Sequence, residues 1–219
     1  MNGRLVSLRP VEEGDLGFLT ALANDPRVRS MVVGWDWPVA GAGQQAWLAG
    51  ITKDPRSVRL TVLDKRSQAP IGLTGLWEVD WHNRSAMPGI KLMPGTSPKG
   101  AGSDAIMLVD AWAFYEVGLR RLHTTILDFN GPSIGAYVRR CGWRIEGRER
   151  QSVFRRGEWC DLYHVALLRT DFASHEAAAE YVRYVCDADV TDKAAVTAGD
   201  WRADQEDPMP STRLGMPAQ

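Results

Sequence analysis

Apolar and polar side chains alternate with a period of two from Ile71 to His82. Such an alternation predicts a strand with its odd-numbered residues, among them Trp77, on one face and Glu78, Asp80 and His82 on the other. Shorter apolar runs bounded by proline, glycine or polar turns predict further strands at 4–10, 58–63, 87–93, 122–129, 143–154 and 162–168.

Between these strands, apolar residues recur at the three- and four-residue spacing of helices. The pattern predicts helices over 16–24, 44–51, 104–117, 132–141 and 173–186, with Ser103 as the N-terminal cap of the third. We expect the strand at 87–93 to be bulged or to start late at Pro88-Gly89. Strands and helices in this mixed order indicate an α/β fold. One domain is expected over 1–172, followed by a C-terminal helix and an acidic, weakly ordered tail over 173–219.

The composition is that of an ordinary globular chain, and it narrows the function classes. The 219 residues include 44% hydrophobic and 24% charged side chains, and the formal net charge is −1, so no bulk positive charge favours nucleic acid or an anionic membrane. No segment approaches the roughly 18 apolar residues of a membrane span. The three cysteines are widely spaced and lack metal-ligand spacing. We therefore expect a cytoplasmic protein with reduced thiols and no metal site.

The turn from Ser97 to Ser103 is glycine-rich and precedes a predicted helix. Backbone N–H groups at a helix start, together with the helix dipole, replace the water around a bound phosphate. Side chains at the approach points would block the phosphate, so Gly100 and Gly102 suit such a site, and Lys99 can add a positive charge. The turn is no Walker loop, and it lacks the third glycine of a GxGxxG motif. Because glycines also serve ordinary turns, the turn alone leaves both interpretations open.

The segment downstream of this turn resembles a known family. The segment contains Asn130, Ser133, Tyr137 and Gly142-Trp143 in that order. This order resembles the pattern of Asn, a small residue, Tyr and then Gly-Phe in the GNAT superfamily of acyl-CoA N-acyltransferases. The family's CoA loop, Arg/Gln-x-x-Gly-x-Gly/Ala, is matched by Gly100 and Gly102 but not at Ser97. The likeness is nearest to the Rim-type branch of protein N-terminal acetyltransferases and their small-molecule relatives. It covers about residues 4–172.

The resemblance implies a mostly antiparallel sheet of six or seven strands, flanked by helices, that splays near Met93 and Leu122 to admit acetyl-CoA. The implied reaction is direct transfer of an acyl group, most simply acetyl, to an amine without a metal. The thioester carbonyl is expected near Leu92 or Met93. The resemblance places the CoA contacts on Lys99, Gly100, Ala101, Gly102, Ser103, Asn130, Ser133 and Arg139, the last toward the 3′-phosphate.

Tyr137 matches the family's general acid, which would donate a proton to the leaving thiolate. The general base is harder to assign. Thr125 stands where some relatives carry a glutamate, and Glu78, Asp80 and His82 remain as groups of which one can act through a water. Their alternative role is that of a solvated strand end. A missing base would favour an acceptor amine of lowered pKa.

The segment Trp35, Asp36, Trp37, Pro38 falls where relatives place the acceptor. Two tryptophans around an aspartate, with His82 as a further contact, can hold a cationic amine, although the same residues can serve packing alone. Three functions remain open. They are acetylation of a protein N-terminus, acetylation of a small amine such as an antibiotic, amino acid or polyamine, and binding of acyl-CoA by a degenerate sensor module. The sequence also leaves a homodimer open.

Overall fold

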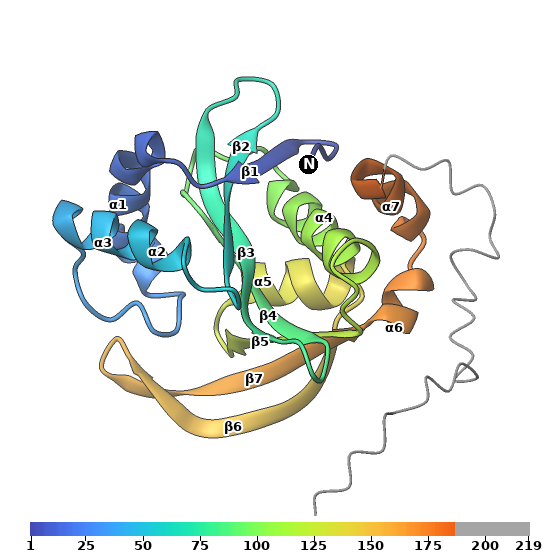
Figure 1. Ribbon diagram of the computed structural model, residues 1–219. Helices are drawn as coiled ribbons and strands as arrows, with labels where there is room; N and C mark the ends of the chain where they lie inside the picture. Colours follow the sequence, from blue (N-terminus) through green and yellow to red (C-terminus); the bar gives the residue numbers. More distant parts are fainter. Residues whose placement is uncertain (187–219) are drawn as a thin grey trace, which may run out of the picture.

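A seven-stranded sheet forms the centre of the protein in the computed structural model, which describes residues 1–186 (Figure 1). The strand order is β1-β2-β3-β4-β5-β7-β6, and every neighbouring pair is antiparallel except β4 and β5, which are parallel. The α/β fold with a mixed, mostly antiparallel sheet is thereby confirmed. The strands are β1 (Val6–Pro10), β2 (Val58–Asp64), β3 (Pro70–Asp80), β4 (Ser85–Leu92), β5 (Arg121–Leu127), β6 (Arg144–Arg155) and β7 (Glu158–Leu168).

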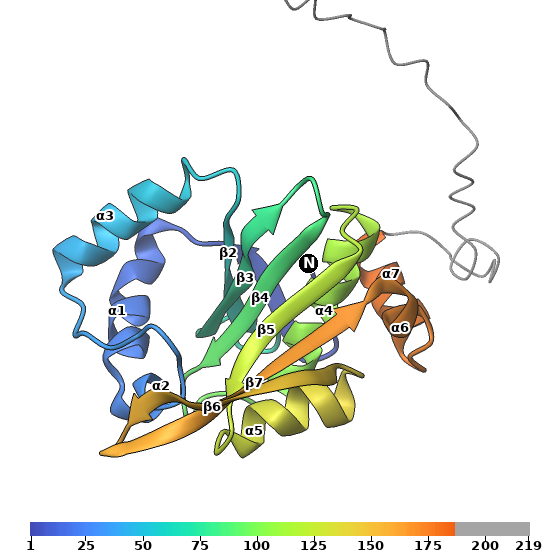
Figure 2. The same ribbon diagram turned by 90° about the horizontal axis from the view of Figure 1, so that it is seen from below.

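Helices cover both faces of this sheet (Figure 2). On one face lie α1 (Leu16–Asn24), α2 (Pro26–Arg29) and α3 (Gly41–Ile51). On the other lie α4 (Ala101–Tyr115) and α5 (Gly131–Ile134), which continues as a π-helix over Gly135–Arg140. A 3₁₀ turn (Glu13–Asp15) precedes α1, and α6 (Arg169–Ala173) and α7 (Ala178–Cys186) follow the last strand. Within residues 1–186 no helix has the length and apolar content needed to cross a bilayer. The predicted tail from residue 187 onward lies outside the described residues.

The sheet splays between β4 and β5. These strands pair only at Ser85↔Arg121 and Ala86↔Leu122, while β5 pairs along its whole length with β7. The proline at position 88 supplies a physical reason. The Met93 N–H donates to the Ile71 carbonyl of β3 at 2.8 Å, so the amides of even-numbered β4 residues point to the opposite edge, toward β5. Pro88 has no N–H to offer there.

Two corrections follow for β4. The strand runs through Pro88-Gly89 in regular register with β3, so the predicted bulge is absent from it. The Met93 amide is already bonded to β3 and cannot receive a thioester carbonyl. Leu92 keeps that role open, because its N–H points to the splayed edge.

The strand predicted over 71–82 ends at Asp80 and is irregular after Trp77. Glu78 adopts φ +53°, and the β3–β4 register shifts there. Val79 consequently lies in the main core on the α4 side. The predicted alternation therefore fails beyond Trp77, and Glu78, Asp80 and His82 do not form one continued face of a strand.

Most of the apolar core lies between the sheet and α4, and a smaller cluster lies under α1. Leu108, Leu122 and Leu167 are completely buried in the main core, where each contributes roughly 1.5–3 kcal/mol. In the smaller cluster, Leu19 and Leu22 of α1 pack on the sheet. The two clusters hold the helices against opposite faces of the splayed strands.

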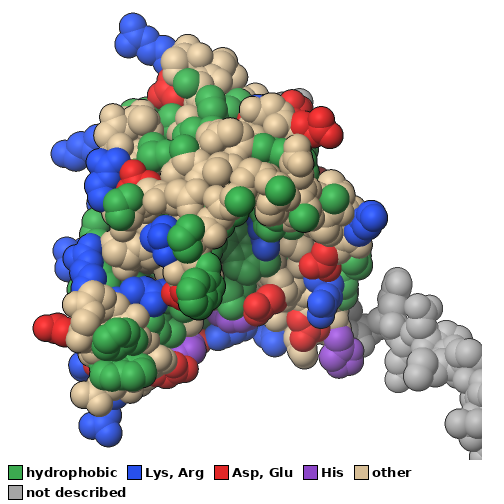
Figure 3. Space-filling view, turned by 90° about the vertical axis from the view of Figure 1, so that its left-hand side faces the viewer, with side chains coloured by type: hydrophobic (Ala, Val, Ile, Leu, Met, Phe, Trp, Pro, Cys, Tyr) green, Lys and Arg blue, Asp and Glu red, His purple; other side chains and the backbone are tan. Residues whose placement is uncertain are grey.

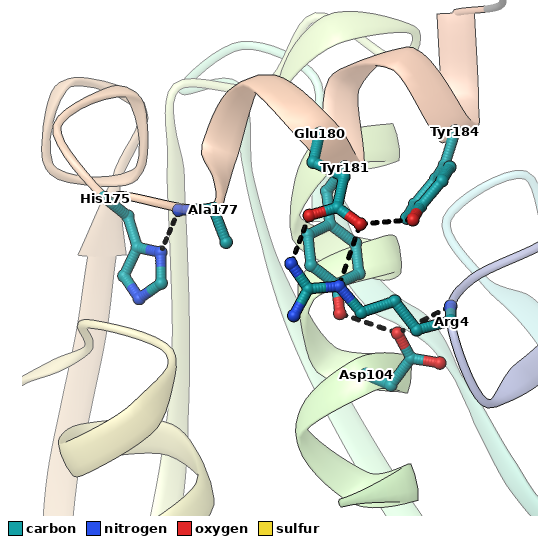
Figure 4. A network of polar contacts seen from close by, with 7 residues as sticks. All are labelled: Arg4, Asp104, His175, Ala177, Glu180, Tyr181 and Tyr184. Atoms are coloured by element: carbon teal, nitrogen blue, oxygen red, sulfur yellow. Dashed lines mark hydrogen bonds and ion pairs between the residues drawn. The ribbon is translucent and has the colours of Figure 1, made fainter.

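A buried carboxylate ties the start of α4 to both ends of the described chain (Figure 4). Asp104 accepts the N–H groups of Arg4, Leu5 and Val6 at 3.1, 2.7 and 2.9 Å and the hydroxyl of Tyr181 at 2.6 Å. Tyr181 belongs to α7, which packs on α4 with Ala178 and Val182 buried in the main core. This network fixes the position of the first turn of α4.

Replacing Tyr181 by Phe should lower the free energy of unfolding by about 1.5–3 kcal/mol, because the hydroxyl bonds a buried, charged acceptor. Urea unfolding measures this difference. Tyr184→Phe is the matched control, since the Tyr184 hydroxyl bonds the solvent-accessible Glu180 and its loss should cost less than about 1 kcal/mol. Equal losses in the two variants would contradict the role given to Asp104.

Candidate functional site

A cavity of about 370 Å³, the splay cavity, lies where β4 and β5 part. It brings together five of the residues predicted from the sequence to contact CoA or to act on it: Leu92, Gly102, Asn130, Ser133 and Tyr137. The amides of Ile90 and Leu92 point to this open edge. An extended, amide-containing ligand can therefore bond β4 in place of the missing strand partner.

The start of α4 opens onto the splay cavity and fits a pyrophosphate. Gly100 caps the helix at φ +96°, a conformation that favours glycine, and Gly102 lines the cavity itself. The hydroxyl oxygens of Ser97 and Ser103 are buried at this helix start without a hydrogen-bond partner. Bare N–H groups and two unpartnered hydroxyls at a helix N-terminus are suitable donors for phosphate oxygens.

Two of the residues predicted in this turn need correction. Ser103 does not cap the helix, because Gly100 holds that position. The Ala101 N–H donates to the Pro98 carbonyl at 3.1 Å and the Ala101 methyl is buried, so this residue offers no free donor. Lys99 and Arg139 are exposed and lie outside the cavity lining, and their contacts with CoA stay predictions.

Asn130 has both ends of its side-chain amide occupied. Its oxygen accepts the Ser133 N–H at 3.2 Å and so caps α5, while its nitrogen donates to the Met31 carbonyl at 3.2 Å. Met31 follows α2 on the opposite wall of the cavity. Asn130 therefore holds the two walls of the splay cavity together.

Tyr137 lies in the π-helix and lines the splay cavity. Its ring meets that of Trp143 edge to face, with centroids 4.9 Å apart, and the Trp143 indole N–H donates to Asp110 at 2.9 Å. Burial, and then the nearby Asp110 carboxyl, hold the pKa of Tyr137 well above its usual range. The phenol therefore stays protonated at neutral pH, as a proton donor must.

A second cavity of about 620 Å³, the tryptophan cavity, opens on the face that carries α1 and α3. Figure 3 looks onto this face and shows a hollow with a hydrophobic floor. Four indole rings line the cavity, those of Trp35, Trp37, Trp47 and Trp77. Trp37 is 83% exposed and stands at the rim. The predicted acceptor residue Asp36 also lines it, but its carboxylate pairs with Arg155 of β6 at 2.7 Å.

The two cavities meet at Trp77 and Lys91, which line both. The Lys91 Nζ lies 4.1 Å from the centroid of the Trp77 ring and 5.5 Å from that of Trp35. Burial, and then the positive charge of Arg59, lower the pKa of Lys91 to about 7. A group placed at this junction can reach both cavities.

Arg59 of β2 shares the Trp77 ring with Lys91. Its guanidinium carbon lies 4.2 Å from the ring centroid, and one of its nitrogens donates to the Leu76 carbonyl at 3.0 Å. Burial lowers the pKa of Arg59 to about 10. Within residues 1–186 this guanidinium forms no salt bridge. The charge of the nearby Asp54 acts on this pKa in the opposite direction, but Asp54 forms no ion pair with Arg59. The tryptophan cavity thus contains a partly buried cation to which no described carboxylate is bound.

The predicted bases Glu78, Asp80 and His82 lie outside both cavities. Asp80 accepts the backbone N–H and the side-chain amide of Asn83 at 2.8 and 2.7 Å, and these bonds lower its pKa. Asp80 also pairs with Ser85, at the end of the sheet where β4 and β5 are still joined. These groups form a turn at the closed end of the splay, which corrects their assignment as bases and, for His82, as an acceptor contact.

Residues 5–144 match the family model of the acetyltransferase (GNAT) domain. The chain belongs to the GNAT acetyltransferase family. It is similar to the spermidine N(1)-acetyltransferase of Vibrio cholerae, with 25% identity over 173 residues that span 78% of this chain and 97% of that protein. The solved structure of the Vibrio cholerae spermidine N-acetyltransferase with CoA and spermine superposes with a TM-score of 0.70 at 24% identity, over 77% of this chain and 98% of that one. A dodecameric structure of that enzyme gives a TM-score of 0.67 at 23% identity, over 78% and 97%.

As a GNAT acetyltransferase, the protein uses acetyl-CoA as its acetyl donor. The splay cavity with the start of α4 is the candidate donor site. The prediction of a GNAT enzyme is confirmed, whereas its assignment to the Rim-type branch stays a prediction. Within the described residues no group of three or more His, Cys, Asp and Glu side chains could hold a metal ion.

Three residues of this GNAT site were missed by sequence reasoning: Arg59, Trp77 and Lys91. A signal was present in the glycines on adjacent strands. An added Cβ at Gly89 would lie 2.5 Å from the Trp77 ring, and one at Gly75 would lie 2.0 Å from the Val58 carbonyl oxygen. Gly89 therefore marks a strand position that leaves room for a large ring, whereas Gly75, at φ +143°, marks a close approach of the β2 backbone.

Replacing Gly102 by Leu should weaken CoA binding about tenfold or more, because a large side chain would stand where a phosphate approaches the start of α4. Gly102→Ala should keep the affinity within about threefold, since the family's loop carries Gly or Ala at this position and the added methyl would lie at ordinary contact distance, 3.6 Å from a Leu92 methyl. Calorimetric titration with CoA measures both affinities. Gly17→Leu in α1, which has open space around it, is the matched control and should leave the CoA affinity unchanged. A Gly102→Leu protein with unchanged CoA affinity would contradict the placement of the pyrophosphate.

Proposed function

We propose that the protein acetylates the primary amine of a small aromatic molecule that also carries an anionic group, such as an aromatic amino acid. The unpaired Arg59 in the tryptophan cavity is the observation that carries this proposal. The cavity joins the donor site at Trp77 and Lys91, so an acceptor held in it can present its amine to the thioester.

The walls of the tryptophan cavity favour a flat, apolar acceptor body. A volume of about 620 Å³ is in the range of small-molecule sites, and four indoles line it. Rings of this kind bind aromatic groups by stacked or edge contacts worth about 0.5–1.5 kcal/mol beyond the buried area. A long aliphatic chain would use few of these contacts.

Arg59 favours an anion on the same molecule. A guanidinium taken partly out of water without a carboxylate is unfavourable until a partner arrives. A carboxylate or phosphate on the acceptor would accept charge-assisted bonds from its free N–H groups. The anion would also fix the orientation of the acceptor, with the ring against Trp77.

The acceptor named for the similar Vibrio cholerae enzyme, spermidine, suits this cavity poorly. Arg59 presents positive charge, and Asp36, the one acid among the described lining residues, is already paired with Arg155. A polyamine would bring further cations next to Arg59, and like charges in contact are destabilising. We therefore propose a monoamine.

The other functions left open by the sequence have less support. A protein N-terminus would need an open groove, whereas this cavity is walled by α1, α3 and the loop that holds Trp35 and Trp37. A degenerate sensor would need neither the second cavity nor a tyrosine in the donor site. Self-association into a homodimer stays a prediction.

Tyr137 is the general acid in this proposal and protonates the CoA sulfur as the thioester bond breaks. Its place in the splay cavity, where the thioester sulfur would lie, supports the assignment. Leu92 is proposed to bind the thioester carbonyl through its N–H at the splayed edge.

A panel of amines tests the acceptor class. Release of the CoA thiol is measured with para-aminomethylbenzoate, benzylamine and spermidine. The carboxylate should raise kcat/KM over benzylamine about 10- to 100-fold, as a charge-assisted bond of about 1.5–3 kcal/mol predicts, and spermidine should be the poorest. Arg59→Met should abolish the preference for the acid, whereas the exposed Arg56→Met should keep it. A higher kcat/KM for spermidine than for para-aminomethylbenzoate would refute this acceptor class. A preference for para-aminomethylbenzoate over benzylamine that remains in Arg59→Met would refute it as well.

Replacing Tyr137 by Phe should lower kcat about 100-fold or more and leave CoA affinity within about threefold of the wild-type value, since only the proton donor is lost. Thiol release and calorimetric titration give the two numbers. Tyr184→Phe, far from the cavity, serves as the control for a lost hydroxyl. Unchanged turnover by Tyr137→Phe at every pH would show that the tyrosine is not the acid.

A further inference from the structure

Lys91 occupies the junction of the donor and acceptor cavities. Odd-numbered β4 residues face α1 and α3, as the packing of Met93 in the smaller core shows. A Cβ added at Gly89 would lie 3.3 Å from the Lys91 Nζ. The ε-amine is therefore folded back along β4, over Gly89 and toward the apex of the splay. It lies between the space for the thioester and the space for the acceptor amine.

The surroundings of Lys91 favour its uncharged form. Burial, and then the like charge of Arg59 of β2, oppose the attraction that the Trp77 and Trp35 rings exert on an ammonium ion, and together they lower the pKa of Lys91. The other charged groups that line the two cavities are already paired. From the loop after α2, Asp36 binds Arg155, and from α2, Arg27 binds Asp25. The strand β3 presents Leu73 and Trp77 to this space, and α1 and α3 present no charged residue to it. No carboxylate is free to hold Lys91 as an ammonium ion.

We propose that Lys91 is the general base of the reaction: its ε-amine takes a proton from the acceptor's ammonium group, and the freed amine attacks the thioester. The assignment rests on the acetyl transfer proposed above and fills the role that Glu78, Asp80 and His82 do not. A base works best when its pKa lies near the working pH. The lowered pKa of Lys91, about 7, therefore suits a base that works near neutral pH.

The protons balance in this scheme. The acceptor ammonium loses two protons when it becomes an amide. Lys91 takes the first and passes it to solvent, which frees the lone pair for attack on the carbonyl carbon. The C–N bond forms, the C–S bond breaks, and the sulfur receives a proton from Tyr137. The second amine proton restores the phenol, so neither side chain is changed at the end of the cycle.

A matched pair of acceptors tests the proposal. The amine of para-aminomethylbenzoate is protonated at neutral pH, whereas that of para-aminobenzoate is neutral and needs no base before attack. Lys91→Met should lower kcat about 100-fold with the first acceptor and less than about tenfold with the second. Lys91→Arg keeps the positive charge but cannot accept a proton, and it should show the same selective loss. Lys53→Met, at an exposed position after α3, is the control.

The pH profile of the wild-type enzyme tests the same point without a variant. With para-aminomethylbenzoate, kcat/KM should fall about tenfold per pH unit below about pH 7, as Lys91 becomes protonated, and should stay level from about pH 7 to about pH 9. Without a base in the site only acceptor molecules already neutral in solution would react, and kcat/KM would instead keep rising up to the pKa of the acceptor amine, about 9–10. With para-aminobenzoate the fall of kcat/KM at low pH should be missing.

Three results would each overturn the proposal. The first is an equal loss of kcat with both acceptors in Lys91→Met, and the second is wild-type turnover by Lys91→Arg. The third is the same fall of kcat/KM at low pH with both acceptors. If the wild type acetylates neither para-aminomethylbenzoate nor para-aminobenzoate, the acceptor class proposed above is wrong. The loss of kcat in Lys91→Met, measured with benzylamine and with aniline, then decides the role of Lys91 independently.

Discussion

The separation of β4 from β5 after Ala86 is the constraint on which the rest of the site depends. Each strand keeps a complete ladder on its other side, β4 with β3 and β5 with β7, so the gap costs the sheet little. Pro88 removes the donor that would otherwise continue the ladder toward β5. The unpaired amides of Ile90 and Leu92 then form a strand edge to which the amide groups of CoA can bind. Next to this edge, the start of α4 offers N–H groups for the phosphates of CoA.

The same gap connects the two faces of the sheet. The donor enters on the side of α4, and the tryptophan cavity opens on the side of α1 and α3. Gly89 on β4 leaves room for the Trp77 ring, against which Arg59 and Lys91 both lie. A single indole on β3 therefore positions both the cation proposed to recognise the acceptor and the amine proposed to remove its proton.

The elements of the fold, and five of the residues that line the splay cavity, could be predicted from the sequence, because they depend on local patterns. Alternation gave the strands, and the order from Gly100 to Tyr137 pointed to the family that the comparisons confirm. The candidate acceptor site was harder to predict, because Arg59, Trp77 and Lys91 come from three different strands. In the sequence, each of them looks like an ordinary strand residue. The errors at Glu78 and Ser103 have local causes. A backbone irregularity with positive φ ended the alternation, and a left-handed glycine started the helix earlier than the serine.

The central claim is that donor and acceptor occupy adjacent cavities at the same time, so that the acetyl group passes directly between them. Calorimetric titration of para-aminomethylbenzoate into the protein, first free and then saturated with CoA, tests it most directly. The account predicts that the CoA-saturated protein binds the amine at least as tightly as the free protein. Displacement of the amine by CoA would contradict it.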